Sequence, residues 1–248
     1  MLRPRTRAAL GAVRDAGAHV IVVTGRMFRS VRPYLEQARL DDPVVCYQGA
    51  VVADPGSGDF LLHVPIPLAD ARDAMDAVLD AGFHLNAYVN DELYVAEVNA
   101  EARRYSEFQH IPVNAVGDLQ EWLERDPTKL VAVGDPDELG ALEAELKPQF
   151  AGRLFISRSL PYFLEFAHHD VSKGSGLAFV AERLEFRPEE TVAGGDGEND
   201  RELLDWAGFG VAVANAHPDV LARADLVVPP VQEEGVATLL ETYLDSLP

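Results

Sequence analysis

The residues with the clearest chemical potential lie in the stretch GDGEND at positions 195–200, between a short apolar run and an amphipathic run. Asp196 and Asp200 place two carboxylates on one turn, and hard oxygen ligands of this kind suit Mg²⁺. Glycines there let a ligand approach the backbone closely, and the Asn199 amide can hold a phosphate oxygen. The alternative is a glycine-rich turn in which Asn199 or Asp200 caps the next helix.

Two other places combine a polar group with a predicted helix start. Thr24 and Gly25 follow an apolar run, and a hydroxyl with free backbone N–H groups there can cradle a phosphate. An ordinary helix cap is the alternative. Lys173 begins a predicted helix, where its charge opposes the helix dipole, so we expect a phosphate or carboxylate beside it. A solvated surface lysine is the alternative.

The elements that must position these groups follow an α/β pattern of alternating apolar and amphipathic runs. The run AHVIVV at 18–23 predicts a strand that is covered on both faces. Residues 191–194 and 209–213 predict two more strands, and 174–184 predicts a helix. Sites in open α/β sheets lie outside the carboxyl ends of strands, and both the turn at Thr24–Gly25 and the stretch at 195–200 follow such ends.

A different pattern occupies residues 65–166. A predicted helix at 68–81 is followed by strand-like runs at 84–89 and 92–96, and further alternation continues to the end of the segment. This predicts an inserted α+β domain at 65–166. The core domain is then expected to comprise 1–64 and 167–248.

Composition limits the class of protein. The chain has 248 residues, of which 48% are hydrophobic and 25% charged, as in ordinary globular proteins. A net charge of −20 repels phosphate backbones and anionic lipid, so neither nucleic acid nor a membrane is an expected partner. Cys46 is the single cysteine, which excludes an internal disulfide. Without an apolar leader we expect a cytoplasmic protein.

Several other motifs are expected to have structural roles and no part in a functional site. The pair Asp135 and Asp137 is expected to cap a helix, the adjacent His168 and His169 to be solvated, and the insert tyrosines Tyr88, Tyr94 and Tyr105 to belong to a core.

As an ordered set, these segments resemble the haloacid dehalogenase (HAD) superfamily. The resemblance rests on VVTGR at 22–26, VSKG at 171–174 and GDGEND at 195–200, and NAHP at 215–218 and EGVA at 234–237 also fit. The most similar branch is the Cof-type (class IIB) phosphatases, which carry a C2 cap. The resemblance implies a Rossmann-like three-layer α/β core with an inserted α+β cap domain.

The resemblance also implies a mechanism through an aspartyl-phosphate intermediate, with Mg²⁺ neutralising charge. The cap would close over the site and select the leaving group. The residues that the resemblance implies for phosphate binding are Thr24, Gly25, Lys173 and Asn199, and Lys173 and Thr24 would also take part in catalysis. For the metal, the resemblance implies that Asp196 binds it directly. Asp200 would hold a metal-bound water or position its loop.

One family segment has no counterpart here. The family begins with a strand and a DxDGT-like loop that supplies the nucleophile, and no such segment precedes Thr24. The chain is either incomplete at its N-terminus or a natural pseudo-enzyme. The first explanation is favoured, because a missing central strand leaves buried backbone groups unpaired at roughly 1–3 kcal/mol each. We therefore expect about 15–20 residues upstream, from family spacing and strand length.

The expected function is Mg²⁺-dependent hydrolysis of a phosphomonoester on a small metabolite, such as a sugar phosphate or a nucleotide-like phosphate. The chain alone is expected to be inactive, because the nucleophile lies upstream. Two alternatives remain, a non-catalytic pseudo-phosphatase that binds a phosphate ligand and a sugar phosphomutase. The sequence carries no signal for oligomeric state.

Overall fold

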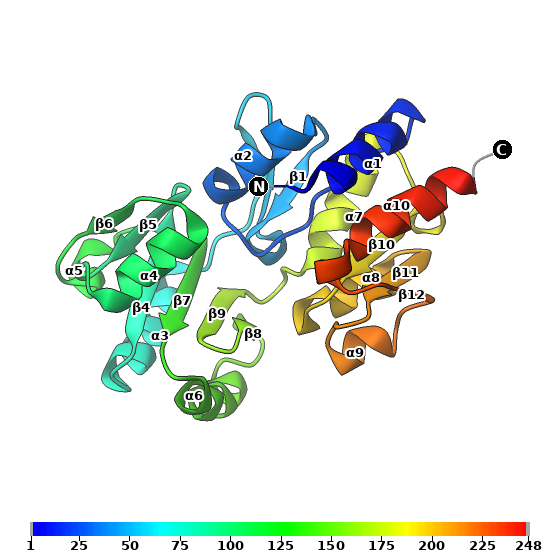
Figure 1. Ribbon diagram of the computed structural model, residues 1–248. Helices are drawn as coiled ribbons and strands as arrows, with labels where there is room; N and C mark the ends of the chain where they lie inside the picture. Colours follow the sequence, from blue (N-terminus) through cyan, green and yellow to red (C-terminus); the bar gives the residue numbers. More distant parts are fainter. Residues whose placement is uncertain (1, 247–248) are drawn as a thin grey trace.

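The computed structural model describes residues 2–246 and divides them between a six-stranded sheet with its helices and a part built on two three-stranded sheets (Figure 1). The six-stranded part is continuous in sequence, and we call it the module. The other part contains both the beginning and the end of the chain. No helix in the described residues has both the length and the apolar character needed to cross a bilayer.

The part outside the module has one antiparallel and one parallel sheet. The first has the order β1-β2-β3 and the second the order β10-β11-β12. The strands are β1 (Val44–Cys46), β2 (Val51–Ala53), β3 (Phe60–His63), β10 (Val192–Gly195), β11 (Phe209–Val213) and β12 (Leu226–Val228). The helices are α1 (Pro4–Asp15), α2 (Phe28–Ala38), α7 (Lys173–Leu184), α8 (Arg201–Trp206), α9 (Pro218–Leu221) and α10 (Gly235–Asp245).

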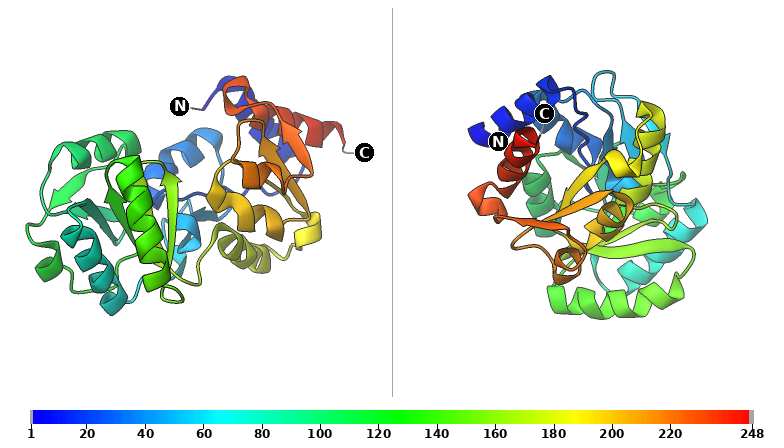
Figure 2. Two further views of the ribbon diagram at one scale, coloured as in Figure 1. Left: turned by 90° about the horizontal axis from the view of Figure 1, so that it is seen from below. Right: turned by 90° about the vertical axis from the view of Figure 1, so that its right-hand side faces the viewer.

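The helices at the two ends of the described chain pack against each other, as both views of Figure 2 show. Arg5 on α1 is paired with Glu241 on α10 at 2.5 Å, and the Thr6 hydroxyl donates to Glu234 at 3.1 Å. Segments that are more than two hundred residues apart thus form one layer.

The module has the strand order β6-β5-β4-β7-β9-β8. Its strands are β4 (His84–Val89), β5 (Glu92–Val95), β6 (Val113–Ala115), β7 (Lys129–Val133), β8 (Leu154–Leu160) and β9 (Phe163–His168). Its helices are α3 (Leu68–Asp80), α4 (Ala100–Gln109), α5 (Leu119–Trp122) and α6 (Pro136–Gln149). The predicted elements of this segment therefore form, while β6 and α5 had no prediction.

The two faces of the module sheet have different partners. Successive strand residues point to opposite faces, and Leu130 and Ala132 of β7 join a core with α3 and α6. Val131 and Val133 instead join a core with Tyr47 and other residues of the part outside the module. The odd-numbered face of β7 is therefore the face that the module turns toward the rest of the chain.

The predicted strand at 18–23 is wrong as a hydrogen-bonded strand. Its only sheet contact among the described residues is a bridge between Val23 and Val45, in which the Val45 N–H donates to the Val22 carbonyl at 2.9 Å. The backbone N–H groups of Ile21 and Val23 donate to no described residue. The run therefore pairs with β1 at this one bridge, and its other edge has no neighbouring strand in the part of the chain that the structure describes.

A cavity of about 920 Å³ adjoins that edge and is lined largely by apolar side chains. Its lining comes from residues 18–23, from β10, β11 and the end of β12, and from helices that include α1, α2 and α10. Protein interiors normally contain few voids larger than one water molecule. Residues 18–23 thus border an unfilled space far larger than one water molecule.

We predict that His84 makes stability depend on acid. The His84 Nε2–H donates to Asn86 and its Nδ1 accepts from Asn99, which only a neutral ring can do. Burial lowers the pKa of His84 from 6.5. Its contribution is therefore complete above about pH 6.5 and is lost as the pH falls through the lowered folded-state value.

In urea unfolding at pH 7.5 and pH 5, His84→Gln should therefore lose less unfolding free energy on acidification than the wild type does. His110→Asn, at an exposed position with a left-handed backbone (φ 55°) that asparagine tolerates, is the control. Equal losses in wild type and His84→Gln would contradict the assignment.

Candidate active site

Thr24 and Gly25 lie where the extended run 18–23 ends. The Thr24 N–H donates to the Val45 carbonyl at 2.8 Å, and the Thr24 hydroxyl oxygen accepts from the Arg26 N–H at 3.2 Å. The hydroxyl hydrogen remains available as a donor. No described residue accepts a hydrogen bond from the Gly25 N–H. Two donors are thus presented together, as an anion-binding turn requires.

Gln48 connects this turn to the third polar stretch. Its amide lies against Gly25, where an added Cβ would stand 2.4 Å from Gln48 Nε2, so a side chain at this position would have to displace the Gln48 amide. Gln48 Oε1 accepts a hydrogen bond from Asn199 Nδ2 at 3.0 Å. The sequence analysis did not identify Gln48 as a site residue. The structure marks it by its backbone conformation, because Tyr47, Gln48 and Gly49 all have positive φ (52°, 61° and 107°). Such strained backbone concentrates at functional sites.

Gly49 brings the second polar stretch to the same place. A Cβ on Gly49 would stand 2.0 Å from the Ser172 carbonyl oxygen, so the two backbones are in direct contact. The Ser172 side chain accepts from the Ser175 N–H and begins α7 with a capping box. Lys173 is therefore the first residue of a helix that is fixed at its N-terminus.

Lys173 has the anionic neighbour that its place in the helix predicts. The Lys173 ammonium donates a hydrogen bond to Asp200 Oδ1, and the two side chains are 10% and 5% exposed. The solvated surface lysine is thereby excluded. A buried lysine needs such a partner because an unpaired charge in the interior is very costly.

Asp200 orders its own loop as well as the lysine. Its Oδ2 accepts from the Asp196 N–H and the Gly197 N–H, both at 2.9 Å. Gly195 permits this approach, because a Cβ there would stand 2.5 Å from Asp200 Cβ. The Asp200 side chain makes no helix-capping hydrogen bond to α8. The carboxylate instead closes the turn at Glu198–Asp200 onto the Gly197 N–H, so the glycine-rich turn that was the alternative is present together with the ion pair to Lys173.

The Asp196 side chain is exposed at the carboxyl end of β10, and no described residue donates a hydrogen bond to its oxygens. A free carboxylate at this edge fits Mg²⁺, which takes oxygen ligands and keeps several waters. The Asp200 oxygens already accept three hydrogen bonds. Of the two predicted metal residues, Asp196 is thus the available ligand, while direct ligation by Asp200 would compete with those donors.

The structure brings all of the predicted site residues together through direct contacts. Gly25 lies against Gln48, Gln48 is bonded to Asn199, and Lys173 is paired with Asp200. Three stretches that are far apart in the sequence therefore meet at one edge of the strands.

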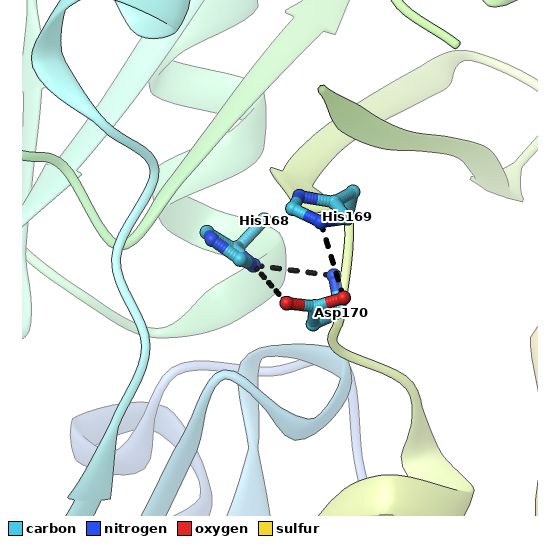
Figure 3. Close-up of side chains that lie close together, drawn as sticks. All are labelled: His168, His169 and Asp170. Carbon is cyan, nitrogen blue, oxygen red and sulfur yellow. Dashed lines mark hydrogen bonds and ion pairs between the residues drawn. The ribbon is translucent and has the colours of Figure 1, made fainter. Parts of the chain in front are cut away.

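His168, His169 and Asp170 form a separate cluster on the link between β9 and α7 (Figure 3). His169 Nε2 lies 3.1 Å from Asp170 Oδ1, and the two imidazole rings stack with centroids 4.5 Å apart. His169 and Asp170 are exposed. These contacts are those of a turn whose side chains hold one another. His169 is solvated as predicted, whereas His168 is half-buried.

The structure also agrees with the structural roles predicted for Asp135 and for the tyrosines of the module. Asp135 caps α6 by accepting from the Asp137 and Glu138 N–H groups. Tyr88 and Tyr105 are buried in a hydrophobic core, while Tyr94 is half-buried against a tryptophan ring.

Gly49→Ala should destabilise the fold severely. The new Cβ would collide with the Ser172 backbone, so we expect a loss of about 3 kcal/mol or more. Gly82→Ala is the matched control, since its φ of +82° is also left-handed but nothing lies within 4 Å. It should cost only about 1–2 kcal/mol. Urea unfolding measures both, and similar losses would show that Gly49 does not make the close contact described.

The pair formed by Lys173 and Asp200 should show strong coupling in a double-mutant cycle. Lys173→Met or Asp200→Asn leaves one uncompensated buried group and should cost about 3–5 kcal/mol, whereas the double variant should lose less than the sum. The surface pair Arg14–Asp41, at 2.9 Å, is the control and should show little coupling. Additive losses at Lys173 and Asp200 would contradict the pairing.

Comparison with known proteins identifies relatives along nearly the whole chain. The model of the haloacid dehalogenase-like hydrolase family matches residues 1–240. The pyridoxal phosphate phosphatase YbhA of Escherichia coli is 27% identical over 98% of this chain and 92% of its own. The 5-amino-6-(5-phospho-D-ribitylamino)uracil phosphatase YitU of Bacillus subtilis is 28% identical over 93% of this chain and 87% of its own.

The fold agrees with that family. The crystal structure of a haloacid dehalogenase-like hydrolase from Bacteroides thetaiotaomicron matches with a TM-score of 0.88 and 23% identity, over 98% of this chain and 93% of that one. The predicted fold class, a Rossmann-like α/β core with an added α+β part, is confirmed. On the match over residues 1–240, the chain is a member of the haloacid dehalogenase-like hydrolase family.

Proposed function

We propose that this protein is a Mg²⁺-dependent phosphatase that hydrolyses a phosphomonoester of a small metabolite through an aspartyl-phosphate intermediate. The observation that carries the proposal is the convergence of the Thr24–Gly25 turn, Lys173 and Asn199 beside the free carboxylate of Asp196. The names of the relatives, which are phosphatases of small phosphorylated compounds, support the reaction class.

Each residue has a role that its surroundings suit. The Thr24 hydroxyl and the Gly25 N–H would donate to two phosphoryl oxygens, and the Asn199 amide would donate to a third. Lys173, held by Asp200, would place a positive charge beside the charge that develops in the transition state. Asp196 would hold Mg²⁺, and the ion, when bound, supplies charge neutralisation between the nucleophile and the phosphate.

The cavity beside residues 18–23 supports a place for the attacking aspartate. We propose that a short apolar strand fills this space of about 920 Å³, pairs with the open edge at Ile21 and Val23, and ends at the level of Thr24. Its carboxyl end would then present the aspartate to the phosphate, as the family's opening strand does. In this proposal a preceding segment of the protein supplies the strand.

The module suits the role of the cap, with the boundaries proposed from the sequence at 65 and 166. Strand β8 contacts the turn at Glu198–Asp200, and module residues bond to Gly25 and Gln48. A module that touches the site loops can exclude water and select the leaving group. The leaving group is proposed to be a sugar or a nucleotide-like moiety.

The test is hydrolysis of a panel of sugar and nucleoside phosphates, with p-nitrophenyl phosphate as a generic substrate. A longer form that carries an in-frame DxD segment should release phosphate in a Mg²⁺-dependent manner, while residues 1–248 alone should show negligible turnover. In the longer form, Asp196→Ala should lower kcat/KM about 100-fold or more, because the ion loses a direct ligand. Asp137→Ala, an exposed acid in the first turn of α6, is the control.

Two results would replace the proposal. Phosphate binding without turnover in the longer form would indicate a non-catalytic pseudo-phosphatase, and a phosphorylated product in place of free phosphate would indicate a mutase. Unchanged Mg²⁺ dependence in Asp196→Ala would contradict the metal assignment.

A further inference from the structure

Lysine is rare in this chain, and its placement is selective. The sequence contains three lysines against a total of 21 basic residues. One of them is Lys173, and a second, Lys129 on β7, is only 2% exposed. Lys129 stands on the odd-numbered face of the module sheet, with Glu165 of β9 on the same face. The module thus places a buried acid–base pair on the surface that it turns toward the site.

The pair is bonded to both phosphate-site loops. The Lys129 ammonium donates to the Gly25 carbonyl at 2.9 Å and lies 3.3 Å from Glu165 Oε2. That same carboxylate oxygen accepts from Gln48 Nε2 at 3.0 Å, and Gln48 in turn accepts from Asn199. A continuous chain of polar contacts therefore runs from the module strands to Gly25 on one side and to Asn199 on the other.

The contact to Gly25 fixes a peptide group that matters to the site. The peptide joining Gly25 to Arg26 has its carbonyl held by Lys129 and its N–H held by the Thr24 hydroxyl oxygen. The preceding peptide carries the Gly25 N–H, the donor without a described acceptor. Because neighbouring peptide planes share a Cα, holding the one limits the rotation of the other.

Stability alone does not account for this pair. Burying two charges is expensive, and apolar residues of similar volume usually stabilise as well or better. The surroundings are apolar and aromatic, with the Lys129 ammonium 5.1 Å from the Tyr88 ring centroid and 5.8 Å from that of Tyr47. A polar pair in such a place is more readily explained by the groups that it orients.

We propose that Lys129 and Glu165 are positioning residues that couple docking of the module to the assembly of the phosphate site. With the module in place, Lys129 sets the Gly25 turn and Glu165 sets the Asn199 amide through Gln48. With the module displaced, both loops lose their supports, and the site binds phosphate weakly. The consequence for phosphate rests on the proposed function, whereas the ordering of the loops does not.

The decisive variant is the double substitution Lys129→Met with Glu165→Gln. It removes both charges, so neither is left buried and uncompensated, and it deletes the bond to Gly25. The matched control is Lys147→Met with Glu143→Gln, a lysine–glutamate pair at 2.7 Å on α6 of the same module, where Lys147 is exposed. Thermal unfolding establishes that both double variants are folded before comparison.

Two measurements on the 248-residue chain decide the matter. Amide hydrogen exchange of peptides covering residues 24–26 and 199 should be about tenfold faster in the Lys129/Glu165 variant than in the wild type or the control. The dissociation constant of inorganic phosphate with Mg²⁺, measured by titration calorimetry, should rise about 10- to 100-fold, as expected for a lost hydrogen bond to a charged group.

The outcomes separate the two proposals. Exchange at residues 24–26 and 199 that equals the control would overturn the positioning role, whatever phosphate does. Faster exchange with unchanged phosphate affinity would overturn the coupling to the site. Wild type that binds no phosphate and, in the longer form, hydrolyses no phosphomonoester would defeat the proposed function, while the exchange result would still decide the ordering of the loops.

Discussion

The carboxylate of Asp200 is the interaction on which the site depends. One of its oxygens accepts from Lys173, and the other accepts from two backbone N–H groups of its own loop. A single buried charge thus fixes the start of α7 to the loop after β10, which no strand pairing joins. Because hydrogen bonds to a carboxylate are roughly twice as strong as neutral ones, this junction is held more firmly than neutral hydrogen bonds would hold it.

The alternation of residues along the module strands adds the second constraint. Each strand gives one set of side chains to the module's own core and the other set to the boundary with the rest of the chain. A shift of one residue would exchange Lys129 with Leu130, burying a charge in the apolar core that the module sheet shares with α3 and α6. The register of β7 is therefore strongly specified, and with it the place of every polar group that reaches the site loops.

Much of this arrangement could be predicted from the sequence. The parts that could not be predicted depend on contacts between segments that are distant in the sequence. The anionic partner of Lys173 and the helix cap at Asp135 follow from local rules about helix ends, so they could be predicted. Gln48 follows a strand, and nothing in the types of Tyr47 and Gln48 reveals the left-handed backbone that orients the Gln48 side chain. Lys129 and Glu165 sit in apolar runs, and their pairing depends on which strands become neighbours.

The run at 18–23 is a case in which the sequence predicts a paired strand that the structure does not contain. Its composition is that of a strand buried on both faces, and its conformation is extended, but hydrogen bonding needs a partner on each side. Local propensity specifies the shape of one segment, whereas pairing is a property of two. The cavity of about 920 Å³ borders residues 18–23, and among the described residues no second strand pairs with them there.

The packing of α1 against α10 has a consequence for synthesis on the ribosome. Translation proceeds from the N-terminus, so α1 leaves the ribosome long before its partner α10. The module strands are contiguous and can pair while the remainder is still being made, but the face of α1 that α10 covers stays exposed until α10 has been synthesised. Contacts between residues so far apart in the sequence slow folding, so this helix face remains uncovered during much of the folding of the newly made chain.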